Sequence, residues 1–220
     1  MLFLSSLGAV TVLDLAIRRA VFKSSTAWFA LHASVNAIIS ILSWPSLVAA
    51  LADPMYMLDS HTYPPCLIGP GSKLPLHLIN ALHVYHILAF PLTTAEWIHH
   101  TGFVLALGST GAWYDWGLLS NYLAFFLCGI PGGVEYALLV AKRSDMCTEY
   151  TFRRYSAWLN IGLRQPGVLL GMGAGYVAVR SGLYQVPLWG IFLHYTLGIF
   201  NVCYYTFAAV VRVGGVSRGE

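Results

Sequence analysis

Residues 74–102 read LPLHLINALHVYHILAFPLTTAEWIHHTG, and this stretch decides the class of the fold. Residues 74–92 are mostly apolar and almost reach the roughly 20 residues that a helix needs to cross a bilayer. The next segment opens with Thr93 and Thr94, which suit a helix N-cap, and with Glu96, whose carboxylate favours the positive end of a helix dipole. The sequence therefore predicts two antiparallel membrane helices joined by a tight turn.

The rest of the chain has the same character, with 57% hydrophobic and 10% charged residues over 220 positions. Soluble domains carry about 25% charged residues. Apolar runs of suitable length lie at 2–17, 27–51, 74–92, 95–113, 117–141, 166–184 and 187–211. We expect an all-α polytopic membrane bundle in one domain over 1–220, with about seven transmembrane helices, or six if the first run does not span.

Two segments are expected outside the membrane core. Residues 53–73 are rich in proline and glycine, which predicts a loop rather than a helix. Residues 148–164 combine basic with aromatic side chains, which predicts an amphipathic helix lying on the cytosolic surface. The side chains that carry this second prediction are Tyr150, Arg153, Arg154, Tyr155 and Trp158.

The distribution of basic residues orients the predicted bundle. Seven spans place most of the basic side chains at one end, leaving Lys73 and Arg180 at the other. Cytosolic loops are enriched in Lys and Arg, so the C-terminus is expected in the cytosol and the 53–73 loop on the opposite side. The cytosolic set is Arg18, Arg19, Lys23, Lys142, Arg143, Arg153, Arg154, Arg164, Arg212 and Arg218. These residues are dispersed, so no nucleic-acid partner is expected.

Histidines within the apolar runs are the strongest functional signal, because polar groups in hydrocarbon are costly. His83 and His86 are three residues apart and share a helix face. His99 and His100 lie one turn into the next helix, so one of them is expected to face His86. Neighbouring residues on a helix point about 100° apart, so the pair is not expected to serve one small ligand together.

Other polar residues in the apolar runs are further candidates. His32 and Asn36 are four residues apart on one face, and Asn121 and Glu135 share a later run. A carboxyl group in an apolar helix tends to keep its proton unless it is paired. Glu135 is therefore a candidate proton donor or acceptor, whereas His77 and His194 are expected to be packing residues.

Residues 97–143, WIHHTGFVLALGSTGAWYDWGLLSNYLAFFLCGIPGGVEYALLVAKR, resemble the central motif of the TLC-domain family, which includes ceramide synthases and translocon-associated membrane proteins. The upstream WFALHASVNAIIS is similar to an early family helix, and the resemblance covers about 27–211. Ceramide synthases carry a His-Asp pair where this chain has Gly132-Gly133, so a separate branch is indicated. The motif positions fall on His32, His99, His100, Asn121, Gly129, Glu135, Leu138, Leu139 and Lys142.

The resemblance implies a helical bundle of the endoplasmic reticulum or another internal membrane that binds or handles lipid. If the protein is an enzyme, the implied chemistry is acyl transfer, with acyl-CoA as a substrate. The catalytic candidates are His99, His100 and Glu135. The candidates for lipid binding or support are His86, His83, His32, Asn36 and Asn121, and no metal site is expected among these residues.

Two alternatives stay open. One is a non-catalytic subunit or a lipid-sensing regulator of a membrane complex. Gly167, Gly171 and Gly175 form two G-x-x-x-G steps that predict close packing against a helix of the same bundle or of a protein partner. The other, which we rank last, is haem or metal ligation by His83 and His86 facing His99 or His100.

Overall fold

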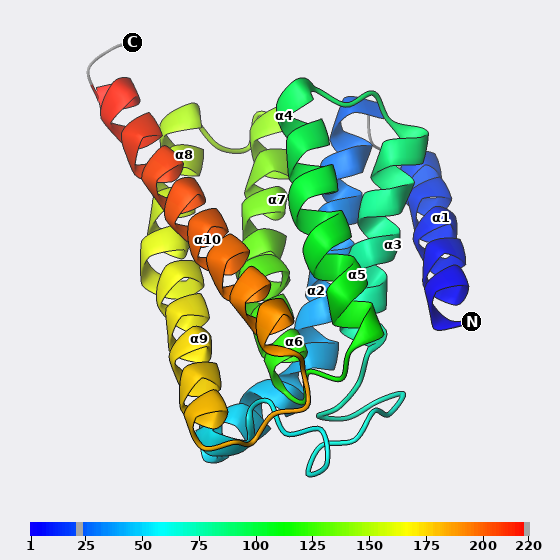
Figure 1. Cartoon of the computed structure of the whole chain (residues 1–220). Coiled ribbons are helices and arrows are strands. Elements are labelled where there is room, and N and C mark those ends of the chain that lie inside the picture. The colour runs from blue at the N-terminus through cyan, green and yellow to red at the C-terminus, as the bar shows by residue number, and fades with distance from the viewer. Residues whose placement is uncertain (21–23, 218–220) are drawn as a thin grey trace.

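The computed structural model describes residues 1–20 and 24–217, so Lys23 and Arg218 of the predicted cytosolic set lie outside the described residues. Every regular element among the described residues is a helix, and the one sheet-like contact in them is an isolated bridge between Cys66 and Ser72. The helices run side by side as a bundle (Figure 1). The predicted all-helical class is confirmed for this part of the chain.

The described helices join into seven rods. Four rods are single helices: α1 (Leu2–Ala20), α2 (Ser24–Ala52), α3 (Leu74–Ala89) and α10 (Leu188–Ser217). The other three each contain a π-helical segment: α4 (Thr94–Ile98), η2 (His99–Leu105) and α5 (Ala106–Trp113); α6 (Leu119–Ala124), η3 (Phe125–Gly129) and α7 (Ile130–Arg143); and α8 (Glu149–Leu159), η4 (Asn160–Arg164) and α9 (Gln165–Arg180).

Consecutive rods run in opposite directions, so the two termini lie at opposite ends of the bundle (Figure 1). Three helices are long and apolar enough to cross a membrane: Thr26–Ala52, Leu119–Arg143 and Leu188–Gly215. Leu74–Ala89 is apolar but shorter. Length and composition thus support a membrane-spanning chain, while the number of spans stays a prediction.

Basic side chains gather where α1 and α7 end and α8 begins, which we call the basic end. Lys73 and Arg180 lie at the opposite end, called the loop end, together with residues 53–73 (Figure 1). Arg164 does not belong in the predicted cytosolic set, because its side chain is 11% exposed and pairs with Glu135 inside the bundle. A buried paired arginine says nothing about which end faces the cytosol.

The helix expected over 148–164 is present and is continuous with the next helix; its place at the cytosolic surface stays a prediction. It starts at Glu149, where the Thr148 hydroxyl accepts a hydrogen bond from the Thr151 amide at 3.1 Å. It then continues through η4 into α9 as one rod. Pro166 stands in the first turn of α9, directly after the π-helical segment, and that local widening explains how a proline fits without a break.

The stripe of Gly167, Gly171 and Gly175 packs within the chain. A Cβ atom added at Gly167 would lie 2.1 Å from the Phe126 ring, and one at Gly171 would lie 2.5 Å from the Tyr122 ring. One at Gly175 would meet the hydroxyl of Tyr195 at 2.4 Å. Because these three positions lack side chains, α9 can approach the α6–η3 segment and α10 closely. This is the packing within one bundle that the G-x-x-x-G steps predicted.

Candidate histidine site

Five histidines from three rods meet toward the basic end of the bundle, and we call them the histidine cluster. The closest ring centroids are 4.8 Å apart for His86 and His100 and 5.1 Å apart for His83 and His100. The members are His32 in α2, His83 and His86 in α3, and His99 and His100 in η2.

His86 and His100 form the centre of this cluster. Nδ1 of His86 lies 2.8 Å from Nε2 of His100, and the two side chains are 5% and 4% exposed. In this hydrogen bond one ring donates its N–H and the other ring accepts. When both rings are neutral, the second nitrogen of the donor ring carries a free lone pair, so it can accept a proton from a bound group.

The neighbouring histidines His99 and His100 point to different partners, as the sequence predicted. His100 meets His86 of α3, whereas Nδ1 of His99 lies 3.2 Å from the hydroxyl of Tyr205 in α10. Both histidines open the π-helical segment η2. Such segments are frequent at functional sites because they aim side chains in directions that a regular helix does not offer.

His32 contributes a polar atom that lacks a partner. Its Nε2 is buried and makes no hydrogen bond to another described residue. The ring is fixed by Tyr136, which stacks on it at 4.2 Å, and by the edge of Trp28 at 3.9 Å. An unpaired polar atom in such a packed place is uncommon in native proteins and calls for an explanation, such as a bound group.

His83 is held by its own helix. Its Nδ1 lies 2.7 Å from the carbonyl oxygen of Ile79, and because a carbonyl oxygen accepts, Nδ1 carries the proton. When His83 is neutral, its Nε2 is then an acceptor. The ring is 5.1 Å from that of His100, so this acceptor belongs to the same cluster.

Glu135 is paired, in contrast to the lone carboxyl group that the sequence suggested. One carboxylate oxygen accepts a hydrogen bond from the hydroxyl of Ser156, and the other lies 3.0 Å from a guanidinium nitrogen of Arg164. Arg164 also donates to the side-chain oxygen of Asn160 at 2.7 Å. This network joins α7 to the α8–η4 rod and lines a small pocket that Tyr205 also lines.

Tyr205 thus stands between the histidine cluster and the Glu135 network. Its hydroxyl contacts His99, and its side chain borders the pocket of Glu135 and Arg164. The predicted catalytic residues therefore fall into two neighbouring sets, the histidines and the Glu135 network.

Asn36 lies one helical turn from His32 and is 4% exposed. A Cβ atom added at Gly132 would lie 2.9 Å from the amide nitrogen of Asn36, and one at Gly133 would lie 3.5 Å from its Cβ. The Gly132-Gly133 pair therefore lets α7 approach α2 closely at this asparagine. Asn36 supports the site by packing.

Asn121 lies elsewhere, which corrects its placement among the site residues. Its amide nitrogen donates to the hydroxyl of Ser46 at 2.9 Å and to the carbonyl oxygen of Ser72 at 2.7 Å. Those partners fix the 53–73 loop at the loop end. The sequence offered no sign of this, because the contact joins segments far apart in the chain.

Sequence reasoning missed several residues of the site. The sequence could have indicated these residues only as aromatic or polar residues within apolar runs. This chain has too many such residues for that pattern to single out the ones at the site. The missed residues are Trp28, Tyr136, Ser156, Asn160, Arg164 as a partner of Glu135, and Tyr205.

His194 is a packing residue, as expected. Its Nδ1 lies 3.1 Å from the carbonyl oxygen of Gly190, and Trp116 packs on its ring at 3.9 Å.

Among the described residues, no group of three or more His, Cys, Asp or Glu side chains is arranged to hold a metal ion. The 2.8 Å contact between His86 and His100 also leaves no space for an iron between those two nitrogens.

No protein-family model matches the chain, and neither the curated proteins nor the solved structures contain a match. The resemblance of residues 97–143 to the TLC-domain motif therefore stays a prediction.

Proposed function

We propose that this chain is a seven-span TLC-like protein that binds lipid at the histidine cluster and transfers an acyl group there. The observation that carries the proposal is the cluster itself: five histidines meet among apolar helices, and His32 keeps a buried nitrogen without a partner. Polar groups at membrane depth are costly and tend to mark functional sites. The resemblance to the TLC-domain motif supplies the lipid class and an internal membrane such as the endoplasmic reticulum.

In the proposed reaction, an imidazole of His99 or His100 acts as general base. It takes the proton from a hydroxyl or amine acceptor while the acceptor atom attacks the carbonyl carbon of an acyl thioester, acyl-CoA in the simplest case. The thiolate then leaves and receives that proton, so a new ester or amide and a free thiol are the products.

The contacts of the cluster suit this role. His86 orients His100 through the nitrogen–nitrogen hydrogen bond, and Tyr205 orients His99. Trp28 packs against the rings of His32 and His86, at 3.9 and 3.7 Å, and closes one side of the cluster. In this proposal Glu135 acts on the histidines through Tyr205 rather than by direct contact.

One observation favours a second candidate, a non-catalytic lipid sensor or a subunit of a membrane complex. Glu135 is already bound by Ser156 and Arg164 and joins two rods, so its role can be to stabilise the packing of these rods. In that case the cluster would bind lipid without chemistry.

The test is native mass spectrometry of the purified chain beside the His99→Ala, His100→Ala double variant. We expect bound acyl lipid, or bound acyl-CoA after incubation with it, in the wild type and its loss in the double variant. A His61→Ala variant is the matched control, since His61 is an exposed histidine in the 53–73 loop.

Each outcome separates the candidates. Formation of a new ester or amide and a free thiol from acyl-CoA that depends on His99 and His100 supports transfer, whereas bound lipid without turnover supports the sensor. Identical spectra for the wild type and the double variant would refute a lipid site at the cluster.

A further inference from the structure

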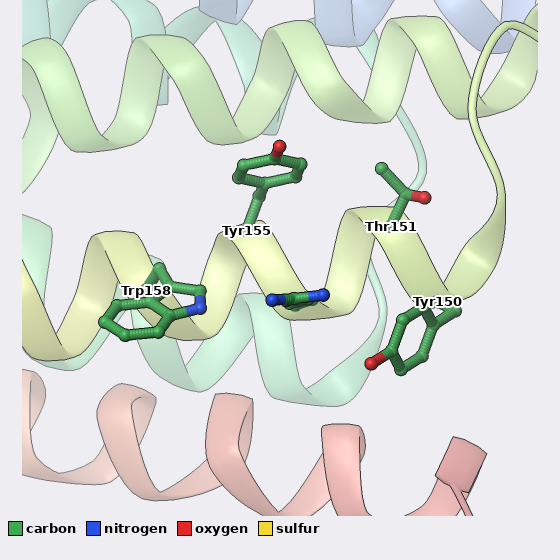
Figure 2. A pocket seen from close by; sticks show the side chains of 5 residues that line it. Tyr150, Thr151, Tyr155 and Trp158 are labelled. Carbon is green, nitrogen blue, oxygen red and sulfur yellow. The ribbon is translucent and has the colours of Figure 1, made fainter.

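A hollow on the outer surface of α8 combines an arginine with three aromatic side chains. It encloses about 480 Å³ and is lined by Tyr150, Thr151, Arg154, Tyr155 and Trp158. Figure 2 shows Thr151 and Tyr155 along one edge of this surface and Tyr150 and Trp158 along the other. We call it the aromatic–arginine hollow.

Arg154 differs from the basic residues around it. Arg153 and Lys142 both bind the carboxylate of Glu149, at 2.6 and 2.9 Å. Arg154 is exposed and has no ion pair with an acidic group among the described residues. The hollow therefore presents one uncompensated positive charge, surrounded by hydroxyl and indole groups that can donate hydrogen bonds.

The length of the rod places this charge relative to the bilayer. Arg154 and Arg180 lie 26 residues apart on the continuous α8–η4–α9 rod. At 1.5 Å per residue the two guanidinium-bearing positions are about 39 Å apart along the axis. A hydrocarbon core is about 30 Å thick, and about 40–45 Å including the headgroup layers. If Arg180 stands in one headgroup layer, Arg154 therefore stands in the other.

The side chains fit that layer. Tyr150, Tyr155 and Trp158 are 44%, 55% and 64% exposed, although each is large and partly apolar. Tyrosine and tryptophan favour the interface, where the ring meets acyl chains and the polar atom meets headgroups. Arginine binds phosphate through charge-assisted hydrogen bonds in a fixed planar geometry.

We propose that the aromatic–arginine hollow binds the phosphate headgroup of an anionic phospholipid in the leaflet at the basic end. Arg154 supplies the charge, and the three aromatic residues hold the glycerol region and the upper acyl chains. This site is separate from the histidine cluster, and the proposal does not depend on acyl transfer.

The test is lipid binding to the purified full chain by native mass spectrometry. Phosphatidylglycerol and phosphatidylcholine with identical acyl chains are titrated in parallel. We expect the wild type to prefer phosphatidylglycerol, and Arg154→Gln to reduce that preference by about fivefold, the effect of one basic residue near an anionic surface. Arg154→Lys should restore part of it.

The matched control is Arg180→Gln, which removes an exposed arginine from the other end of the same rod. We expect it to leave the preference unchanged. Trp158→Leu keeps the charge but removes an indole ring, and it should weaken the binding of both lipids.

Three outcomes would overturn the proposal. In the first, wild-type protein binds the two lipids equally. In the second, Arg154→Gln and Arg180→Gln lower the preference to the same extent, which would indicate a diffuse charge effect. In the third, inorganic phosphate at equal concentration displaces phosphatidylglycerol, which would indicate a simple anion site. Because Arg154 is exposed, unchanged thermal stability of Arg154→Gln is the check on folding.

Discussion

The hydroxyl of Tyr205 in α10 lies 3.2 Å from Nδ1 of His99 in η2, so the last rod of the bundle contacts the histidine cluster directly. The same tyrosine borders the pocket of Glu135 and Arg164. One side chain thereby joins the histidine cluster to the Glu135 network.

Tyr205→Phe should release His99 without changing the packing of α10. We expect a change in the nitrogen-15 chemical shift of the His99 ring, because its Nδ1 loses a hydrogen bond. The cost in folding free energy should be about 1 kcal/mol at most, since the residue is 38% exposed. Tyr204→Phe is the control, and equal spectra for the two variants would contradict the contact.

Asp14 should be essential for the attachment of α1. Its carboxylate is buried, accepts from the Tyr85 hydroxyl at 2.6 Å and pairs with Arg18 at 2.7 Å. Asp14→Ala leaves both partners without an acceptor, so we expect a loss of about 1–3 kcal/mol in the free energy of unfolding. Thermal unfolding in detergent is the measurement, and Arg19→Gln, at an exposed position nearby, should change little.

Tyr85→Phe tests the same bond from the other side. Its effect should overlap with that of Asp14→Ala, so the double variant should be less destabilised than the sum of the two single variants. Strict additivity would mean that the two residues do not interact.

Alanine substitutions at the glycines of α9 should distinguish glycines that contact another rod from a glycine that affects only helix propensity. Gly167→Ala places a methyl group against the Phe126 ring, and Gly171→Ala places one against Tyr122, so each should destabilise by about 1–3 kcal/mol. A Cβ atom at Gly173 meets nothing within 4 Å. Gly173→Ala should therefore be neutral or stabilising by up to about 1 kcal/mol. Similar melting temperatures for all three variants would contradict the packing of α9.

The basic end should weaken in acid because of Glu149. Hydrogen bonds from Lys142 and Arg153 lower the pKa of this carboxyl group below its ordinary value of 4.5. A lowered pKa in the folded state means that the stabilisation is present above about pH 4.5 and is lost as the pH falls through the folded-state value. The effect should be small, because the group is exposed and screened by solvent.

Melting temperature measured between pH 3 and pH 7 tests this prediction. The decline of the wild type below about pH 4.5 should be reduced in Glu149→Gln, which is less stable at neutral pH. Asp145 is close in the chain but forms no ion pair with Lys142 or Arg153, so Asp145→Asn should follow the wild-type profile. A Glu149→Gln profile parallel to that of the wild type would contradict the assignment.

The sequence predicted the features that depend on local composition. Apolar runs located the rods, and prolines and glycines located the 53–73 loop. The position of His86 near a short turn predicted that one of His99 and His100 faces it, and the structure shows that this residue is His100. Each of these follows from periodicity or from neighbouring helices.

Features that depend on distant pairing escaped prediction. Glu135 and Arg164 are 29 residues apart, and nothing in the sequence distinguished Arg164 from a loop arginine. The π-helical segments were also missed, because one widened turn leaves no pattern of apolar residues. Without them, the directions of His99 and of Arg164 could not be assigned.

The bonds of Asn121 have a consequence for how the chain is built. This residue joins Ser46, at the end of α2, to Ser72, which precedes α3, although it belongs to the fifth rod. During synthesis the first three rods therefore precede the side chain that makes these bonds. The Ser46 hydroxyl can already bond the carbonyl oxygen of Pro70, but the bonds from Asn121 form only after the fifth rod is made, so the loop end is completed out of chain order.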